Sequence, residues 1–263
     1  MSAARARVRA TGAAVLVLAL IAGIGWLLIA PRIAAYQERH RTVAPDTPLA
    51  EQCVEDIPDS AERIVLTASD GTKLGGATVG ASDARTAIVL RQGAGQRICQ
   101  WLPFAAELAE QAGVRVVLFD RRGRGSSPAP ADLTKEPDDL QVAVQYAVEH
   151  GADRIALLAS SMGNSIMFAA VGDLAPTPCA VVSVSPVLVS DVDGSDPRRL
   201  PAKVFVVSEE RLSGTVESLR TAADDQGAVF ESLLLDTGDH SLQLVKNHDD
   251  AQRFIIDSVK TCA

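Results

Sequence analysis

Short apolar runs that alternate with helix-like stretches restrict the fold of this chain more than any other feature. From residue 63 onward, runs of about four to six mostly apolar residues, typical of buried strands, are separated by longer amphipathic segments. The predicted strands are Arg63–Ala68, Leu74–Val79, Ala87–Leu90, Val114–Phe119, Arg154–Ala159, Val204–Val207 and Phe230–Leu235. The predicted helices are Trp101–Gln111, Asp139–His150, Ser165–Val171, Val216–Gln226 and Asp249–Lys260. This order predicts an α/β fold with a mostly parallel, twisted sheet of about eight strands and helices on both faces.

A dinucleotide-binding domain shares this alternation, but its first strand–helix turn should carry G-x-G-x-x-G. Here Gly93–Ala94–Gly95 is followed by Gln96–Arg97–Ile98, so the third glycine is missing. We find no cofactor or metal motif in the sequence, and we predict neither a cofactor nor a metal ion. The net charge of −8 also argues against a nucleic-acid partner.

A serine follows the predicted strand Arg154–Ala159 in a setting typical of a nucleophile. Ala159 and Gly163 stand two residues before and after Ser161, where a tight strand-to-helix turn leaves room only for small side chains. Such a turn exposes the hydroxyl and directs the next N–H, that of Met162, at a developing oxyanion. The structural alternative is a serine that begins a helix as its N-cap.

His240 is the best candidate for the base that would activate this serine. It lies in a loop directly after the predicted strand Phe230–Leu235, whereas His40, His150 and His248 do not follow a strand. A histidine that comes last in the chain, after the serine, has the expected order.

From these residues on, the chain resembles the α/β-hydrolase family, from about Arg63 to the C-terminus. Asp120–Ser127 is similar to the family's D-x-R-G-x-G-x-S segment, and Arg91–Gly95 occupies the place of its His-Gly-x-Gly turn. The resemblance implies that the N–H of Ala94 is a second oxyanion donor. Gln92 stands where the family has the histidine of that turn.

The acidic partner of the histidine departs from the family pattern. After the strand Val204–Val207 the family has an aspartate, but this chain reads Ser208–Glu209–Glu210. A glutamate can orient the histidine equally well, so Glu210 is our first candidate and Glu209 the second. Asp191 and Asp193, in the loop that precedes the strand Val204–Val207, are the alternative, and a solvated acidic loop without function is the structural interpretation.

The sequence predicts a serine hydrolase that cleaves acyl esters or thioesters and acts on a small acyl substrate or a lipid. Only Pro186–Ala202 separates the strand Val204–Val207 from the strand before it. This leaves no room for a large helical cap and favours an open site. The alternative is an inactive α/β-hydrolase-like binding or structural module.

The N-terminal region predicts attachment to a membrane. Ala10–Ala30 is uncharged and rich in Leu, Ile, Val and Ala, and arginines precede it, which favours a signal anchor over residues 1–30. Cleavage after Ala35, giving a secreted protein, is the alternative. Residues 31–62 are proline-rich and predict a linker, so that the hydrolase domain would span residues 63–263 outside the cytoplasm.

The chain has four cysteines without metal-type spacing. Export would allow two disulfides. Cys179 and Cys262 are expected at the same lower edge of the sheet, which would leave Cys53 with Cys99. Three pairings exist, the sequence does not choose among them, and four buried thiols are the alternative.

Overall fold

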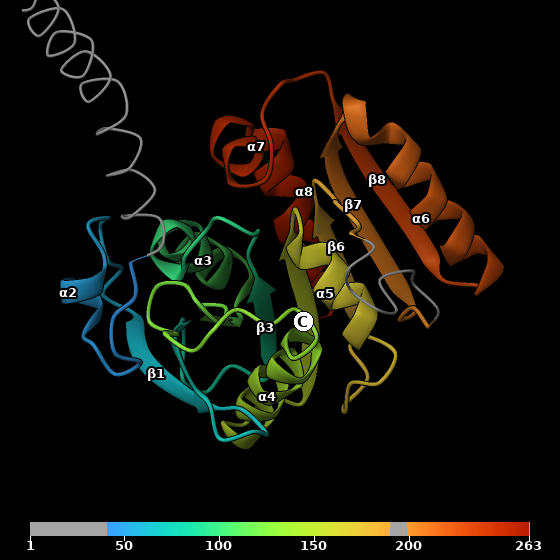
Figure 1. Ribbon diagram of the computed structural model, residues 1–263. Coiled ribbons are helices and arrows are strands. Elements are labelled where there is room, and N and C mark those ends of the chain that lie inside the picture. Colours follow the sequence, from blue (N-terminus) through green and yellow to red (C-terminus); the bar gives the residue numbers. More distant parts are fainter. Residues whose placement is uncertain (1–40, 190–198, 263) are drawn as a thin grey trace, which may run out of the picture. The chain divides into compact units, whose positions relative to one another are not determined.

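The computed structural model of the protein describes residues 41–189 and 199–262. Thr42–Ala263 forms one compact unit, which is built around a single eight-stranded sheet (Figure 1). The strands are β1 (Ala61–Thr67), β2 (Lys73–Val79), β3 (Thr86–Arg91), β4 (Arg115–Phe119), β5 (Arg154–Ser160), β6 (Ala180–Val184), β7 (Lys203–Glu209) and β8 (Val229–Leu235). They lie in the order β1-β2-β4-β3-β5-β6-β7-β8, which confirms the predicted α/β fold.

The strands after the first hairpin run in one direction. β1 and β2 are antiparallel, β2 is antiparallel to β4, and every later pair is parallel. The register sets Ser160, the last residue of β5, beside Val184 at the end of β6. Because the strands β3 to β8 are parallel, their carboxyl ends meet at one edge of the sheet, where ligand sites of open α/β sheets are built.

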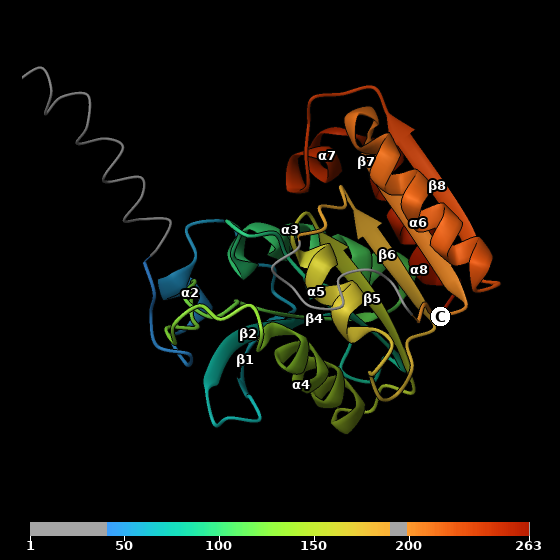
Figure 2. The ribbon, with the colours of Figure 1, turned by 45° about the vertical axis from the view of Figure 1, so that its right-hand side comes forward.

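Helices cover both faces of the sheet because strand side chains point alternately to either side. Ile88 and Leu90 of β3 belong to one core, together with helices α3 (Ile98–Ala112), α7 (Leu242–Asn247) and α8 (Asp249–Lys260). Val89 belongs to the other core, with α4 (Glu136–Glu149), α5 (Gly163–Ala170) and α6 (Ser213–Asp225). Figures 1 and 2 show α4 and α5 on the side of the sheet opposite to α8.

The predicted helices are all present; Asp249–Lys260 has the predicted bounds, and the ends of the other four are shifted. α3 begins at Ile98, three residues before its predicted start, because the buried Asp120 carboxylate accepts the N–H of Ile98 and fixes the first turn. Two short helices, α2 (Leu49–Gln52) and α7, have no counterpart in the sequence prediction. Helices of four and six residues are too short for a clear apolar period.

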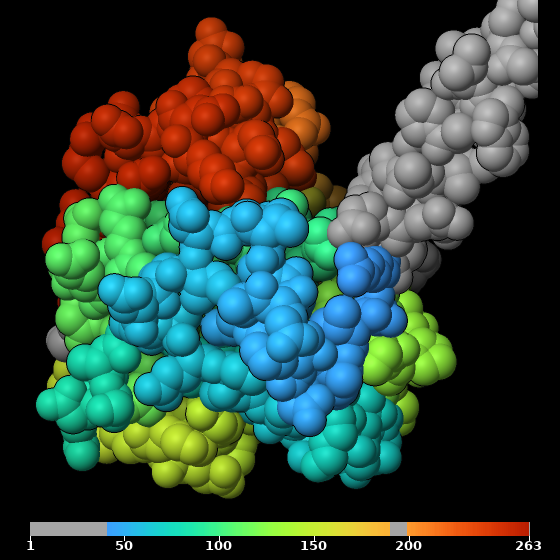
Figure 3. Space-filling model, turned by 90° about the vertical axis from the view of Figure 1, so that its left-hand side faces the viewer, coloured from blue at the N-terminus to red at the C-terminus, as the bar shows by residue number. Residues whose placement is uncertain are grey.

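Residues 42–60, assigned to a linker from sequence, pack on the folded body. Thr42 pairs with Gly125, the N–H of Val43 donates to the carbonyl of Gly125 at 2.8 Å, and Leu49 is buried. In Figure 3 these residues, in blue, cover one face of the domain. The domain thus begins about twenty residues before the predicted boundary, because side-chain contacts and a disulfide hold a segment that lacks regular periodicity.

Two disulfides join the four cysteines, in the one of the three possible pairings that the sequence analysis had named as plausible without choosing it. Cys53 bonds Cys99 and so ties α2 to α3, and Cys179 bonds Cys262 at the opposite end of the sheet, with Cα–Cα distances of 5.3 and 5.9 Å. The predicted span Ala10–Ala30 lies outside the described residues. Among the residues that are described, no helix has the length and apolar character to cross a bilayer.

Candidate active site

Ser161 occupies the tight turn between β5 and α5, as its flanking small residues predict. Its φ of 53° lies in the left-handed region, which is uncommon for a residue with a side chain. Strained backbone of this kind is found mainly at functional sites. The N–H of Ser161 donates to the carbonyl of Val184 at 2.9 Å and holds the turn against β6. A Cβ on Gly163 would lie 2.4 Å from the carbonyl oxygen of Arg91, which explains the small residue there.

The structure brings Ser161, His240 and Glu209 together at the carboxyl ends of three different strands, β5, β8 and β7. The Ser161 Oγ lies 2.8 Å from Nε2 of His240, and Nδ1 of the same ring lies 2.7 Å from Oε1 of Glu209. The His240 side chain is 31% exposed, whereas that of Glu209 is fully buried. The serine hydroxyl can therefore pass its proton to an imidazole whose far side faces a fixed carboxylate.

The acid beside His240 is Glu209, not Glu210, which was our first candidate. β7 extends to Glu209, two residues beyond the predicted end, and Glu210 is exposed at the start of a short 3₁₀ turn, Glu210–Leu212. Strand parity was the signal that separates them: Phe205 and Val207 face the α7 and α8 side, and Glu209 continues that series. Asp191 and Asp193 lie outside the described residues.

The surroundings of Glu209 stabilise its ionised form. Burial opposes ionisation, but hydrogen bonds from its own backbone amide, from the Ser185 hydroxyl and from His240 outweigh it, so the pKa of Glu209 is lowered. Arg211, which the sequence analysis missed, places Nη2 at 2.7 Å from the same Oε1 and at 3.1 Å from Nδ1 of His240. The buried carboxylate is therefore compensated by hydrogen bonds and by an opposite charge.

A cavity of about 400 Å³ opens in front of Ser161 and His240. The cavity is lined by residues 93–96, Ser161, residues 238–241 and Gln243. None of these residues has a large aliphatic or a benzenoid aromatic side chain. Ala94 is among them, and its N–H and that of Met162 donate to no protein acceptor within the described ranges. Both predicted oxyanion donors are thus unoccupied beside the serine.

Gln92 takes over the supporting contacts of the turn in place of the family's histidine. Its Nε2 donates to the carbonyl of Phe119 at 2.8 Å, at the end of β4. Below it, the buried Arg91 donates to the carbonyl of Gln92 at 2.9 Å and pairs with Glu136, which also pairs with Arg121. The turn is held from beneath by a buried ion-pair cluster that the sequence analysis did not identify.

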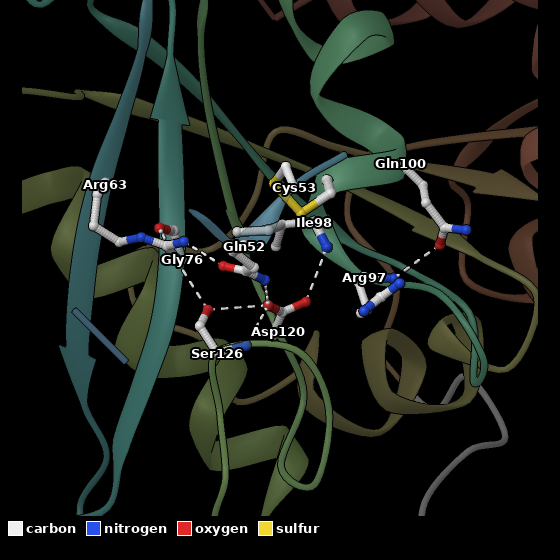
Figure 4. The surroundings of a disulfide bond; sticks show 10 residues. Gln52, Cys53, Arg63, Gly76, Arg97, Ile98, Gln100, Asp120 and Ser126 are labelled. Atoms are coloured by element: carbon white, nitrogen blue, oxygen red, sulfur yellow. Dashed lines mark hydrogen bonds between the residues drawn. A yellow bond between two sulfur atoms is a disulfide. The ribbon is translucent and has the colours of Figure 1, made fainter. Parts of the chain in front are cut away.

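The Asp120–Ser127 segment builds a second polar centre away from the cavity (Figure 4). Asp120 is completely buried and accepts hydrogen bonds from the N–H of Ile98, the N–H and hydroxyl of Ser126, and the amide of Gln52, at 2.6 to 3.0 Å. A Cβ on Gly125 would lie 2.1 Å from Oδ2 of Asp120, which explains the glycine. The segment joins β4, α3 and α2 into one structure.

No metal site emerges in the part of the chain that the structure describes. No three His, Cys, Asp or Glu side chains within residues 41–189 and 199–262 are grouped so that they could hold a metal ion.

The fold has counterparts among solved structures. Solved structures that are similar include an esterase from Pyrococcus furiosus, with 14% identity, 80% of this chain and 97% of that chain covered, and a TM-score of 0.64. An esterase of the bacterial hormone-sensitive lipase family shares 19% identity over 78% of this chain and 85% of that chain, with a TM-score of 0.58. A predicted CIB-like hydrolase from Thermoplasma acidophilum shares 16% identity, covering 76% and 98%, with a TM-score of 0.60.

These identities are low, so the likeness to the solved structures establishes the fold. No curated protein matches the chain. The family model described as "Serine aminopeptidase, S33" matches residues 82–237, which is more than half of the sequence and contains Ser161 and Glu209. The chain therefore belongs to this family of α/β-hydrolase serine hydrolases.

Proposed function

We propose that the protein hydrolyses short acyl esters with Ser161 as nucleophile, His240 as base and Glu209 as its acidic partner. The observation that carries this proposal is the pair of hydrogen-bond distances from His240, 2.8 Å to Ser161 and 2.7 Å to Glu209. A serine, a histidine and a carboxylate in this geometry perform acyl transfer on several unrelated folds.

In the acylation step, Oγ of Ser161 attacks the ester carbonyl carbon while its proton passes to Nε2 of His240. The carbonyl oxygen becomes an oxyanion that the N–H groups of Ala94 and Met162 stabilise. When the tetrahedral intermediate collapses, His240 returns the proton to the departing alcohol and leaves an acyl-serine. Water then attacks the acyl-serine, His240 accepts a proton from it, and the carboxylic acid leaves as Ser161 regains its proton.

Glu209 keeps the imidazole in the tautomer that this sequence needs. With a proton on Nδ1 directed at Glu209, Nε2 is left as the acceptor toward Ser161. The lowered pKa of Glu209 keeps the carboxylate ionised, and it stabilises the imidazolium that forms.

The cavity supports a short and polar substrate. Its walls consist of glycine, alanine and polar side chains, so a long acyl chain would meet little apolar surface. The esterases among the similar structures favour an ester over an amide. An inactive binding module is the competing function, and a lipid headgroup ester is the competing substrate.

The test is labelling of the domain from Thr42 onward with a fluorophosphonate probe, beside Ser161→Ala and His240→Ala. We expect labelling of the parent and loss of at least about 10³-fold in either variant. Turnover of p-nitrophenyl acetate should exceed that of the palmitate ester. A folded parent that neither reacts with the probe nor hydrolyses either ester would favour the binding module.

We further propose that residues 1–30 anchor the protein in a membrane with the hydrolase domain outside the cytoplasm. The uncharged run Ala10–Ala30 supports the anchor, and two disulfides fit an oxidising compartment. Fractionation of the full chain should recover it with membranes and sensitive to protease added outside the cell. Recovery of a shortened chain in the medium would support secretion instead.

A further inference from the structure

Three serines in the described part of the chain have backbone conformations that are uncommon for residues with a side chain. Ser161, Ser185 and Ser241 have φ values of 53°, 47° and 60°, and no other described non-glycine residue has a positive φ. Ser185 follows β6, and Ser241 follows His240 directly. Backbone strain of this kind persists only where the surroundings enforce it.

Hydrogen bonds link two of these serines to the acid. Ser185 lies against the Glu209 carboxylate with its hydroxyl, and this hydroxyl accepts the N–H of Ser241 at 2.8 Å. Ser185, Glu209 and Ser241 are buried, with exposed fractions of 2% or less. The strained backbone at Ser241 therefore directs its N–H toward the group that holds Glu209.

The side chain of Ser241 continues the chain of contacts toward the oxyanion turn. Its hydroxyl pairs with that of Ser160, which precedes the nucleophile, and accepts Nε2 of Gln96 at 2.9 Å. Oε1 of Gln96 accepts the N–H of Gly93 at 3.0 Å and the indole N–H of Trp101 at 3.0 Å. Gly93 is the residue directly before Ala94.

These contacts form a continuous path between the two halves of the site. One end is the acid–base pair, Glu209 at the end of β7 and His240 after β8, and the other is the turn after β3 that carries Ala94. None of the polar side-chain atoms on this path is among the buried atoms without a partner. A buried network whose members are all satisfied is rigid, and its members act together.

We propose that Gln96 and Ser241 are positioning residues that set the oxyanion turn relative to His240. Their mutual hydrogen bond is a direct side-chain link between the loop of residues 92–97 and the loop of residues 236–241. Acyl transfer needs the nucleophile, base and oxyanion donors within about 0.5 Å of their productive places. The inference rests on the proposed function, because it names how that site is aligned.

The experiment uses Gln96→Met, Ser241→Gly and the double variant in the domain from Thr42 onward. Methionine keeps the length of Gln96 without its hydrogen bonds, and glycine keeps the φ of 60° and the N–H of Ser241 without the hydroxyl. We expect each single variant to lower kcat for p-nitrophenyl acetate by about 10–100-fold with KM within about threefold. Because the two residues act through one link, the kcat of the double variant should be no lower than that of the less active single variant.

Gln100→Met is the matched control. Gln100 lies in the first turn of the same helix, where its Oε1 accepts the N–H of Arg97 at 3.1 Å (Figure 4), and in the described part of the chain it forms no hydrogen bond with Ser241. This control removes a similar hydrogen bond and should leave kcat within about twofold. If Gln96→Met lowers kcat no more than Gln100→Met, or if the losses of the two single variants multiply in the double variant, the positioning role is overturned.

The rate of fluorophosphonate labelling separates this inference from the proposed function. A parent that does not react would reject the esterase proposal itself. A parent that reacts, with Gln96→Met and Ser241→Gly reacting equally fast, would leave the esterase standing and reject the positioning role. Thermal unfolding of each variant establishes that the folded protein is being compared.

Discussion

Two fully buried carboxylates, Asp120 and Glu209, lie at different places in this domain and behave in opposite ways. Burial raises the pKa of Asp120, although four hydrogen bonds from neutral groups partly oppose it. For Glu209 burial acts in the same direction, but its own amide, Ser185 and His240 prevail and the pKa is lowered. The direction of each pKa shift therefore depends on how desolvation and the hydrogen-bonding partners balance at that carboxylate.

The groups that contact the two carboxylates also differ in whether they can gain or lose a proton. Asp120 is held by backbone N–H groups and by the side chains of Gln52 and Ser126. Arg63 donates in turn to both of these side chains (Figure 4). Glu209 contacts an imidazole that can gain and lose a proton and an arginine that is 57% exposed. The first arrangement suits a structural joint, and the second suits a site that takes part in proton transfer.

The largest difference between the two centres should appear in the activity of Glu209→Gln. A glutamine cannot balance the imidazolium and can impose the wrong tautomer on His240, so kcat should fall by about 10³–10⁴-fold. Glu210→Gln is the matched control and should retain parental kcat, because Glu210 is exposed and makes no contact with His240. Equal losses in the two variants would contradict the assignment of the acid.

Asp120→Asn should act on stability instead. All four hydrogen bonds to Asp120 come from donors. The side-chain NH₂ group of an asparagine at this buried position would therefore face donors and find no acceptor. We expect the free energy of unfolding to fall by about 2–4 kcal/mol, or the Tm by about 10 °C. The kcat of the remaining folded protein, measured well below the Tm, should stay within about fivefold of the parent. A loss of activity as large as that of Glu209→Gln would remove the distinction between the centres.

Replacing Cys53 and Cys99 by serine tests how α2 supports the Asp120 centre. Loss of a disulfide that closes a loop of this length costs about 2–4 kcal/mol. Gln52, the neighbour of Cys53, binds Asp120, so this change and Asp120→Asn should give a combined loss of stability smaller than their sum. The same change at Cys179 and Cys262, at the other end of the sheet, should add to Asp120→Asn in full. Denaturant titration of the single and combined variants measures the two sums.

The smallest effect concerns pH. Because the pKa of Glu209 is lowered on folding, its contribution to stability is present above the unfolded value of about 4.3 and is lost as the pH falls through the folded value. The raised pKa of Asp120 acts in the opposite sense: its contribution is present below about 3.9 and is lost as the pH rises. The difference in the free energy of unfolding between the parent and Glu209→Gln should therefore become smaller from pH 6 to pH 3. The same difference between the parent and Asp120→Asn should become larger. Differences that change in the same direction would contradict the two pKa directions.

The sequence by itself determined the alternation of strands and helices, the turn around Ser161 and the position of His240 after the last strand. These features depend on short-range rules: apolar periodicity decides which segments become strands, and small residues are required where a backbone turns sharply. The segment Asp120–Ser127 was equally recognisable, and the structure explains its Gly125 by the close approach of the buried Asp120 carboxylate.

Only the tertiary structure decided which glutamate lies against His240, how residues 42–60 pack, and that Ser185, Ser241 and Gln96 join one network. Glu209 and Glu210 are adjacent and chemically identical, and β7 had to extend to Glu209 before strand parity could turn that side chain inward. The network joins residues that are up to 145 positions apart, so no local pattern marks it. Long-range contacts of this kind depend on how the elements pack, and that packing is set by the whole chain rather than by any one segment.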